Sequence, residues 1–192
     1  MKTIRTKVYQ FNELNDKAKS YAIEQERNDY QQHGEPLYFF EEYCKDRAAE
    51  EGFNDCQFQW SLGYCQGDGL SFSCNDFDLK KFLTENTRLS RFINVYAANL
   101  KVEIKGNTGR YCFASRSDVD LYLENYKKDY PNFESLIPHL LECLEGKYLA
   151  LCKELQETGY KWIEAEDEES AIIDRIEANE YDFTADGKRF HQ

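Results

Sequence analysis

The sequence predicts an α+β fold, in which an antiparallel sheet built from hairpins carries helices packed on one face and a helical C-terminal half follows. Two stretches of alternating apolar and polar residues, each interrupted by a glycine-containing loop, predict the hairpins. Apolar residues at helical spacing beyond Pro131 predict the helical half. We expect one domain over residues 1–192, with a mixed part over 1–126 and a mainly helical part over 127–192 that ends in a small closing hairpin.

The N-terminal quarter predicts one strand and two helices. Alternation from Ile4 to Val8 indicates a strand that ends near Gln10. Asn15 is a favourable N-cap for a helix that reaches about Arg27. A second helix begins near Pro36, where a first helical turn tolerates the missing N–H, and stops at Gly52.

The residues from Phe58 to Cys74 predict the hairpin around which the rest is organised. Phe58, Trp60, Leu62 and Tyr64 alternate with polar or small residues, and the alternation resumes at Leu70. Between the two halves lies Gly67-Asp68-Gly69, and these residue types tolerate the positive φ angles of tight turns. We interpret the aromatic residues of this hairpin as core, because the segment from Gln57 to Asp78 has no Lys or Arg to hold a nucleic acid.

A helical region over 77–96, broken at Asn86-Thr87, separates this hairpin from a second one. The second hairpin is predicted by alternation over 100–104, a loop at 105–109 and a return strand containing Tyr111 and Phe113. Alternation at 119–123 leaves open whether that return strand is long or is followed by another.

The C-terminal half predicts a long helix, a last helix and a closing hairpin. Pro138 and Gly146 are expected to kink or shorten the long helix. The acidic run, Glu164 to Glu169, precedes the last helix, where negative charge is favourable. The closing hairpin is expected over 181–190.

Composition limits the classes of partner. The net charge of −12 opposes direct binding to nucleic acid or to an anionic membrane, and it favours binding to a basic surface of another protein. The seven cysteines are an odd number without CxxC spacing, and no secretory segment precedes them, so we expect a reducing, cytoplasmic setting. Thiol spacing and three scattered histidines also argue against a zinc site, and we expect no cofactor.

Three segments resemble a family of tailed-phage and prophage proteins of uncharacterised activity. They are residues 9–19, the segment from Trp60 to Phe72 with Gln66-Gly67-Asp68-Gly69 at its centre, and residues 171–187. The resemblance implies a phage or prophage origin and no role for any residue. Small acidic phage proteins often act against host defence systems, so it also implies an anti-CRISPR or other anti-defence function, which is an association and not a mechanism.

The expected function is therefore inhibition of a host defence protein or ribonucleoprotein complex, bound through an acidic surface in the cytoplasm of the host cell. No catalytic motif occurs, so we expect a binding protein rather than an enzyme. The alternative is a small phage enzyme or ligand-binding protein centred on the Gly67-Asp68-Gly69 loop. The residues predicted to contact the partner are Gln66, Asp68, Glu164, Glu166, Asp167, Glu168 and Glu169.

Overall fold

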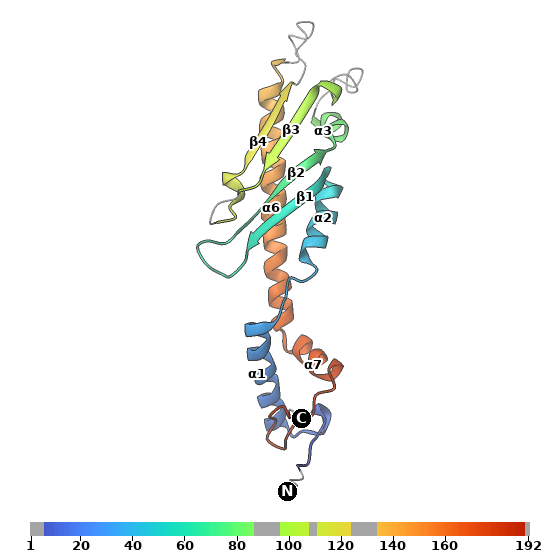
Figure 1. The fold of residues 1–192 in the computed structure, drawn as a ribbon, viewed down its shortest axis with the longest axis vertical. Helices are drawn as coiled ribbons and strands as arrows, with labels where there is room; N and C mark the ends of the chain where they lie inside the picture. The colour runs from blue at the N-terminus through green and yellow to red at the C-terminus, as the bar shows by residue number, and fades with distance from the viewer. Residues whose placement is uncertain (1–5, 87–96, 108–110, 124–133, 191–192) are drawn as a thin grey trace, which may run out of the picture. The chain divides into compact units, whose positions relative to one another are not determined.

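The computed structural model describes residues 6–86, 97–107, 111–123 and 134–190 (Figure 1). Contacts divide the chain into two compact units. The sheet unit is Phe39–Tyr160, and the terminal unit is Met1–Tyr38 together with Lys161–Gln192. The single domain over 1–192 stays a prediction.

The sheet unit contains a four-stranded antiparallel sheet in the order β1-β2-β3-β4. Its strands are β1 (Phe53–Ser61), β2 (Gly69–Phe77), β3 (Leu100–Lys105) and β4 (Asp118–Leu123). The first hairpin is confirmed, with Phe58 opposite Phe72 and Cys56 opposite Cys74. The α+β fold class is confirmed with it.

Two helices cover the apolar face of this sheet. They are α2 (Phe40–Glu50) and α6 (Ile137–Asp167), of which α6 runs behind the strands in Figure 1. The Phe72 ring is fully buried and lies 4.7 Å from the Tyr148 ring on α6 and 5.3 Å from the Phe53 ring, centroid to centroid. Phe40 on α2 meets Trp60 edge-on at 5.4 Å. The interpretation of the hairpin aromatics as core is therefore confirmed for Phe72, but it is wrong for Tyr64, which lies beyond the end of β1 and is exposed.

The second hairpin is confirmed at β3, but its predicted return strand is wrong. Tyr111 and Phe113 lie outside any strand, and the partner of β3 is β4. Just after β3, the chain lies close to the backbone of β2. Gly106 lies so close to the Phe72 backbone that a Cβ would contact it at 2.9 Å, and the Gly106 N–H donates to the Ser73 hydroxyl at 2.9 Å. The chain then makes the short helix η2 (Ala114–Arg116) before β4.

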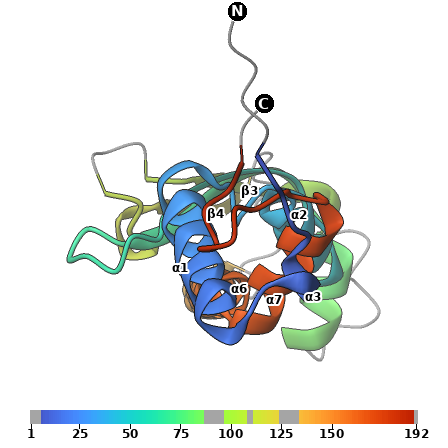
Figure 2. The same cartoon turned by 90° about the horizontal axis from the view of Figure 1, so that it is seen from below.

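The terminal unit has a small core of its own. It contains η1 (Phe11–Glu13), α1 (Asp16–His33) and α7 (Glu169–Ala178), and α1 packs against α7. Asn15 caps α1 as predicted, its side chain accepting from the Ala18 N–H at 3.0 Å. Figure 2 shows the segment after α7 returning past α1, and a Cβ at Gly187 would collide with the Ala18 carbonyl. The core residues are Phe11, Leu14, Ala18, Ala22, Ile23, Ile172, Ile176 and Phe183.

Several predicted boundaries change. The N-terminal strand is reduced to an isolated bridge between Tyr9 and Phe183, and its predicted start at Ile4 lies outside the described residues. α1 continues six residues beyond Arg27, to His33. α3 (Leu79–Asn86) confirms the first half of the region over 77–96, whereas the second half, 87–96, lies outside the description.

The predicted shortening of the long helix is confirmed at Pro138, since residues 135–136 form a turn and α6 begins only at Ile137, and it is wrong at Gly146. α6 continues from Ile137 to Asp167 through Gly146. Pro138 is its second residue, and in the first turn the missing N–H has no helical partner to lose. Glycine has a low helix propensity, so Gly146 weakens α6 locally. Packing of the buried face of α6 nevertheless supplies most of the stability of such a helix.

Candidate functional site

The loop between β1 and β2 is held together by the Asp68 carboxylate. The carboxylate accepts a hydrogen bond from the Cys65 N–H at 3.2 Å, and the Cys65 thiol donates to it at 3.1 Å. The Tyr160 hydroxyl on α6 donates to the same group at 2.5 Å. Asp68 therefore closes its own loop and ties it to the helix behind.

These contacts change the pKa values of both partners. Desolvation acts to raise the pKa of Asp68, but hydrogen bonds from Tyr160 and Cys65 outweigh it and hold that pKa well below its usual range. Burial and the neighbouring Asp68 carboxylate raise the pKa of Tyr160. Asp68 is thus an ionised structural group at neutral pH, while Gln66 beside it is exposed at the tip of the loop.

Aromatic side chains surround this loop. The Tyr64 ring lies 4.8 Å from the Tyr160 ring, and Tyr64 itself has a positive φ of 55° and is 62% exposed. A Cβ at Gly67 would lie 2.7 Å from the Tyr111 ring, so only glycine fits beneath that ring. Sequence reasoning missed Tyr160 and Tyr111, because no local pattern connects either of them to the loop.

The acidic run was predicted to precede the last helix, but the structure divides it between the end of α6 and the start of α7. Glu164, Glu166 and Asp167 belong to the last turn of α6, Glu168 is the N-cap of α7, and Glu169 begins α7. The helix-dipole explanation therefore holds only for Glu168 and Glu169. Negative charge in the last turn of α6 is unfavourable, because the carbonyl end of a helix is itself negative.

Cations of the terminal unit offset part of that cost. Arg175 on α7 pairs with Glu166 at 2.8 Å, and its guanidinium lies 3.5 Å from the centre of the Tyr30 ring. Burial and the Glu166 carboxylate raise the pKa of Tyr30. Asp167 is 3.6 Å from the Arg27 guanidinium and accepts from the Gln31 amide at 3.1 Å.

The run continues into a longer acidic surface. Between Glu164 and Glu180 the chain has eight carboxylates and a single cation, Arg175. Glu166 is the only one of the eight that is not exposed. We call the other seven the acidic surface: Glu164, Asp167, Glu168, Glu169, Asp174, Glu177 and Glu180. Asp174, Glu177 and Glu180 were missed because they are spaced along α7 and its end rather than consecutive.

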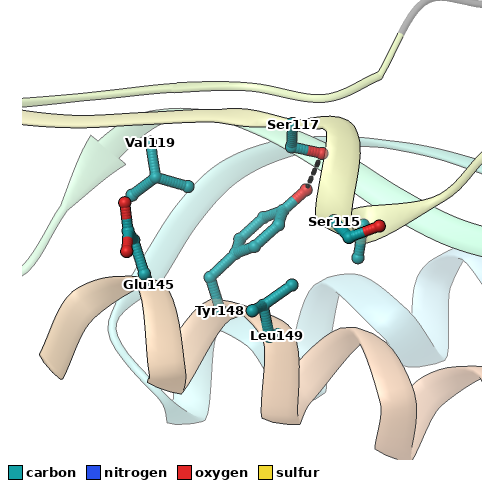
Figure 3. Close-up of a pocket in the computed structure, with 7 residues that line it drawn as sticks. Ser115, Ser117, Val119, Glu145, Tyr148 and Leu149 are labelled. Atoms are coloured by element: carbon teal, nitrogen blue, oxygen red, sulfur yellow. Dashed lines mark hydrogen bonds between the residues drawn. The ribbon is translucent and has the colours of Figure 1, made fainter. Parts of the chain in front are cut away.

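A small cavity of about 210 Å³ lies between β4 and α6 (Figure 3). Ser115, Ser117, Glu145, Tyr148 and Leu149 are among its lining residues. The Tyr148 hydroxyl is 2.8 Å from the Ser117 hydroxyl and 3.0 Å from the Phe72 carbonyl, so it is already paired. The volume is below the ~300–1,000 Å³ of usual ligand pockets. This cavity is a weaker candidate site than the acidic surface.

The described residues contain neither a cluster of metal ligands nor a membrane-spanning helix. In residues 6–86, 97–107, 111–123 and 134–190, no three His, Cys, Asp or Glu side chains are grouped to hold a metal ion. No helix in that same part of the chain has both the length and the apolar character needed to cross a bilayer. Comparison with known protein families, with curated proteins and with solved structures found no match for this chain.

Proposed function

We propose that this protein is a phage-encoded inhibitor of a host defence system, and that it binds a basic, nucleic-acid-handling protein in the host cytoplasm through its acidic surface. The observation that carries the proposal is the seven exposed carboxylates between Glu164 and Glu180, a stretch of sequence whose single cation, Arg175, is paired with Glu166. Such a surface offers a nucleic-acid-binding protein the charge that it meets on a phosphate backbone.

The arrangement of the charges supports a binding role over a purely structural one. Three carboxylates lie in the last turn of α6, where the helix dipole opposes them. Asp174 and Glu177 lie further along α7, away from the N-terminal turn that acidic residues stabilise. Ion pairs account for Glu166 and Asp167, and the start of α7 accounts for Glu168 and Glu169. Helix-dipole stabilisation gives no reason for Asp174 and Glu177, whereas attraction of a basic partner does.

The Asp68 loop has a smaller part in this proposal. Its carboxylate is engaged by Cys65 and Tyr160, so a partner would meet Gln66 and the exposed Tyr64 ring first. The alternative of a small-ligand site centred on Gly67-Asp68-Gly69 loses its proposed coordinating group for the same reason. We therefore keep the loop as a second protein contact.

The test is capture of the partner from host lysate, followed by binding measurements on the purified pair. The acidic-surface variant is E168Q/E169Q/D174N/E177Q. The matched control, E42Q/D46N/D120N/E142Q, removes the same charge from exposed residues of the sheet unit. We expect the first variant to bind about tenfold or more weakly, and the control to bind like the parent chain at equal ionic strength.

Two further measurements separate mimicry from other kinds of inhibition. Affinity should fall as salt rises from 50 to 300 mM, because exposed charges are screened. The partner's own DNA or RNA should compete with this chain for binding. Affinity that is independent of salt, together with equal binding by both variants, would rule out the acidic surface as the contact even if inhibition is observed.

A further inference from the structure

Four of the seven cysteines are buried in the sheet unit: Cys44 on α2, Cys56 on β1, Cys74 on β2 and Cys152 on α6. Cys56 and Cys74 differ from the other two because they are directly opposite each other in the antiparallel register. Directly opposed residues place their side chains on the same face of a sheet. The two thiols therefore share one buried site.

The strand pairing fits a bond between these two sulfurs. Opposed residues of antiparallel strands have Cα atoms about 4.5–5.5 Å apart, and disulfides span about 4.4–6.8 Å. Both Sγ atoms also approach one acceptor, the Asn54 carbonyl oxygen, at 3.7 Å for Cys56 and 3.2 Å for Cys74. Both sulfurs therefore lie within reach of the same carbonyl oxygen, on strands whose pairing sets the two residues opposite each other.

We propose that Cys56 and Cys74 form an oxidisable dithiol, which a peroxide converts into a disulfide that joins β1 to β2. One thiolate attacks a peroxide oxygen; the O–O bond breaks, and the products are a sulfenic acid and, for hydrogen peroxide, water. The other thiolate attacks the sulfenic sulfur, forms the S–S bond and releases a second water. The two thiols together lose two electrons and two protons, and the peroxide gains them.

The disulfide would close a ring over residues 56–74, which contains the whole β1–β2 loop and the contacts between Asp68 and Cys65. Such a ring restricts the unfolded chain, so the oxidised protein should unfold at a higher denaturant concentration than the reduced protein. Each of the two residues keeps only about one-twentieth of its surface exposed, at 6% for Cys56 and 5% for Cys74. Oxidation should therefore be slower than that of the exposed Cys65.

The test uses the full chain with Cys65→Ser, which removes the exposed thiol that would otherwise couple two molecules. The folded protein is treated with hydrogen peroxide, alkylated in denaturant and digested for mass spectrometry. We expect a peptide pair linked through Cys56 and Cys74 that disappears after dithiothreitol, while Cys44 and Cys152 are recovered alkylated. Recovery of Cys56 and Cys74 as separate alkylated or sulfinic residues, or linked to other cysteines, would overturn the proposal.

Two further substitutions in this background form a matched pair. Cys56→Ala should abolish both the linked peptide and the shift in denaturant midpoint that peroxide produces. Cys152→Ala, at another buried thiol of the same unit, should retain both. A midpoint shift of equal size in the Cys56→Ala protein would contradict the assignment. Circular dichroism checks that each variant folds, and peptide mapping of the Cys65→Ser protein decides the pairing without them.

Discussion

The Tyr160 hydroxyl on α6 donates a hydrogen bond of 2.5 Å to the Asp68 carboxylate, although 92 residues separate the two in the sequence. The same carboxylate accepts from the backbone and the thiol of Cys65. One side chain thus fixes the shape of the β1–β2 loop and its attachment to the helix. A partner that binds the exposed Gln66 and Tyr64 would depend on this anchor, the hydrogen bond between Tyr160 and Asp68.

Removing the anchor should loosen the loop without unfolding the protein. We predict that Tyr160→Phe lowers the free energy of unfolding by about 1 kcal/mol, the usual contribution of one hydrogen bond, since this one is only partly buried. Urea unfolding measures the change, and amide hydrogen exchange at Cys65 should become faster. Tyr122→Phe, at an exposed tyrosine of β4, is the control. Equal effects of the two substitutions would show that the hydroxyl of Tyr160 is not the anchor.

Acid should weaken a second ionic contact in the sheet unit. Glu51 lies 2.9 Å from the Lys147 amine and 2.8 Å from the Arg47 guanidinium, and hydrogen bonds from Lys147 and then Arg47 lower the pKa of Glu51 from 4.5 to about 2. Because the folded-state pKa is the lower one, ionised Glu51 stabilises the fold above pH 4.5. That contribution is lost as the pH falls from 4.5 to about 2.

We therefore predict that Glu51→Gln is less stable than the parent chain at pH 7 and that the difference shrinks toward pH 2. Denaturant unfolding at a series of pH values tests this. Glu42→Gln, at an exposed residue of α2, the helix whose C-cap is Glu51, serves as the comparison. A stability difference between Glu51→Gln and the parent chain that does not change with pH would contradict the assigned direction.

Two glycines of α6 should respond to alanine in opposite directions. A Cβ at Gly146 would meet nothing within 4 Å, whereas a Cβ at Gly159 would collide with Leu62 and lie 2.9 Å from the Phe40 ring. We predict that Gly146→Ala stabilises the protein by about 0.5–1 kcal/mol, because alanine restricts the unfolded chain and favours the helix. Gly159→Ala should destabilise it by about 1–3 kcal/mol through overpacking.

Thermal and urea unfolding of the two alanine variants provide the check, and each is the control of the other because both lie in α6. A gain in stability from Gly159→Ala would mean that Leu62 and Phe40 make room, and that the loop packs less tightly against the helix than the structure indicates.

Local patterns were sufficient for the elements whose causes are local. The Asn15 cap, the alternation on both sides of Gly67-Asp68-Gly69 and the helical spacing after Pro131 each depend on residues a few positions apart. Each of them predicted the type of element correctly. The hairpin was predicted without its register, because register depends on how many residues the loop takes, and this loop extends back to Leu62.

The acidic run illustrates what local reasoning leaves out. Its six residues from Glu164 to Glu169 are conspicuous in the sequence, but they do not say that one helix ends among them and another begins. Pairing of Glu166 with Arg175 follows only once α7 has folded back. The three further exposed carboxylates, Asp174, Glu177 and Glu180, lie on α7 and just after its end, where the run itself does not indicate them.

Composition and short-range pattern thus specified the fold class, the acidic character and most helices and strands, because hydrogen bonding and hydrophobic periodicity act over a few residues. The tertiary structure alone brought Asp68 to Tyr160, placed Gly106 against the Phe72 backbone of β2 and set Cys56 opposite Cys74. These contacts join residues from 18 to 92 positions apart, and they form only when several elements pack together to exclude water from one core.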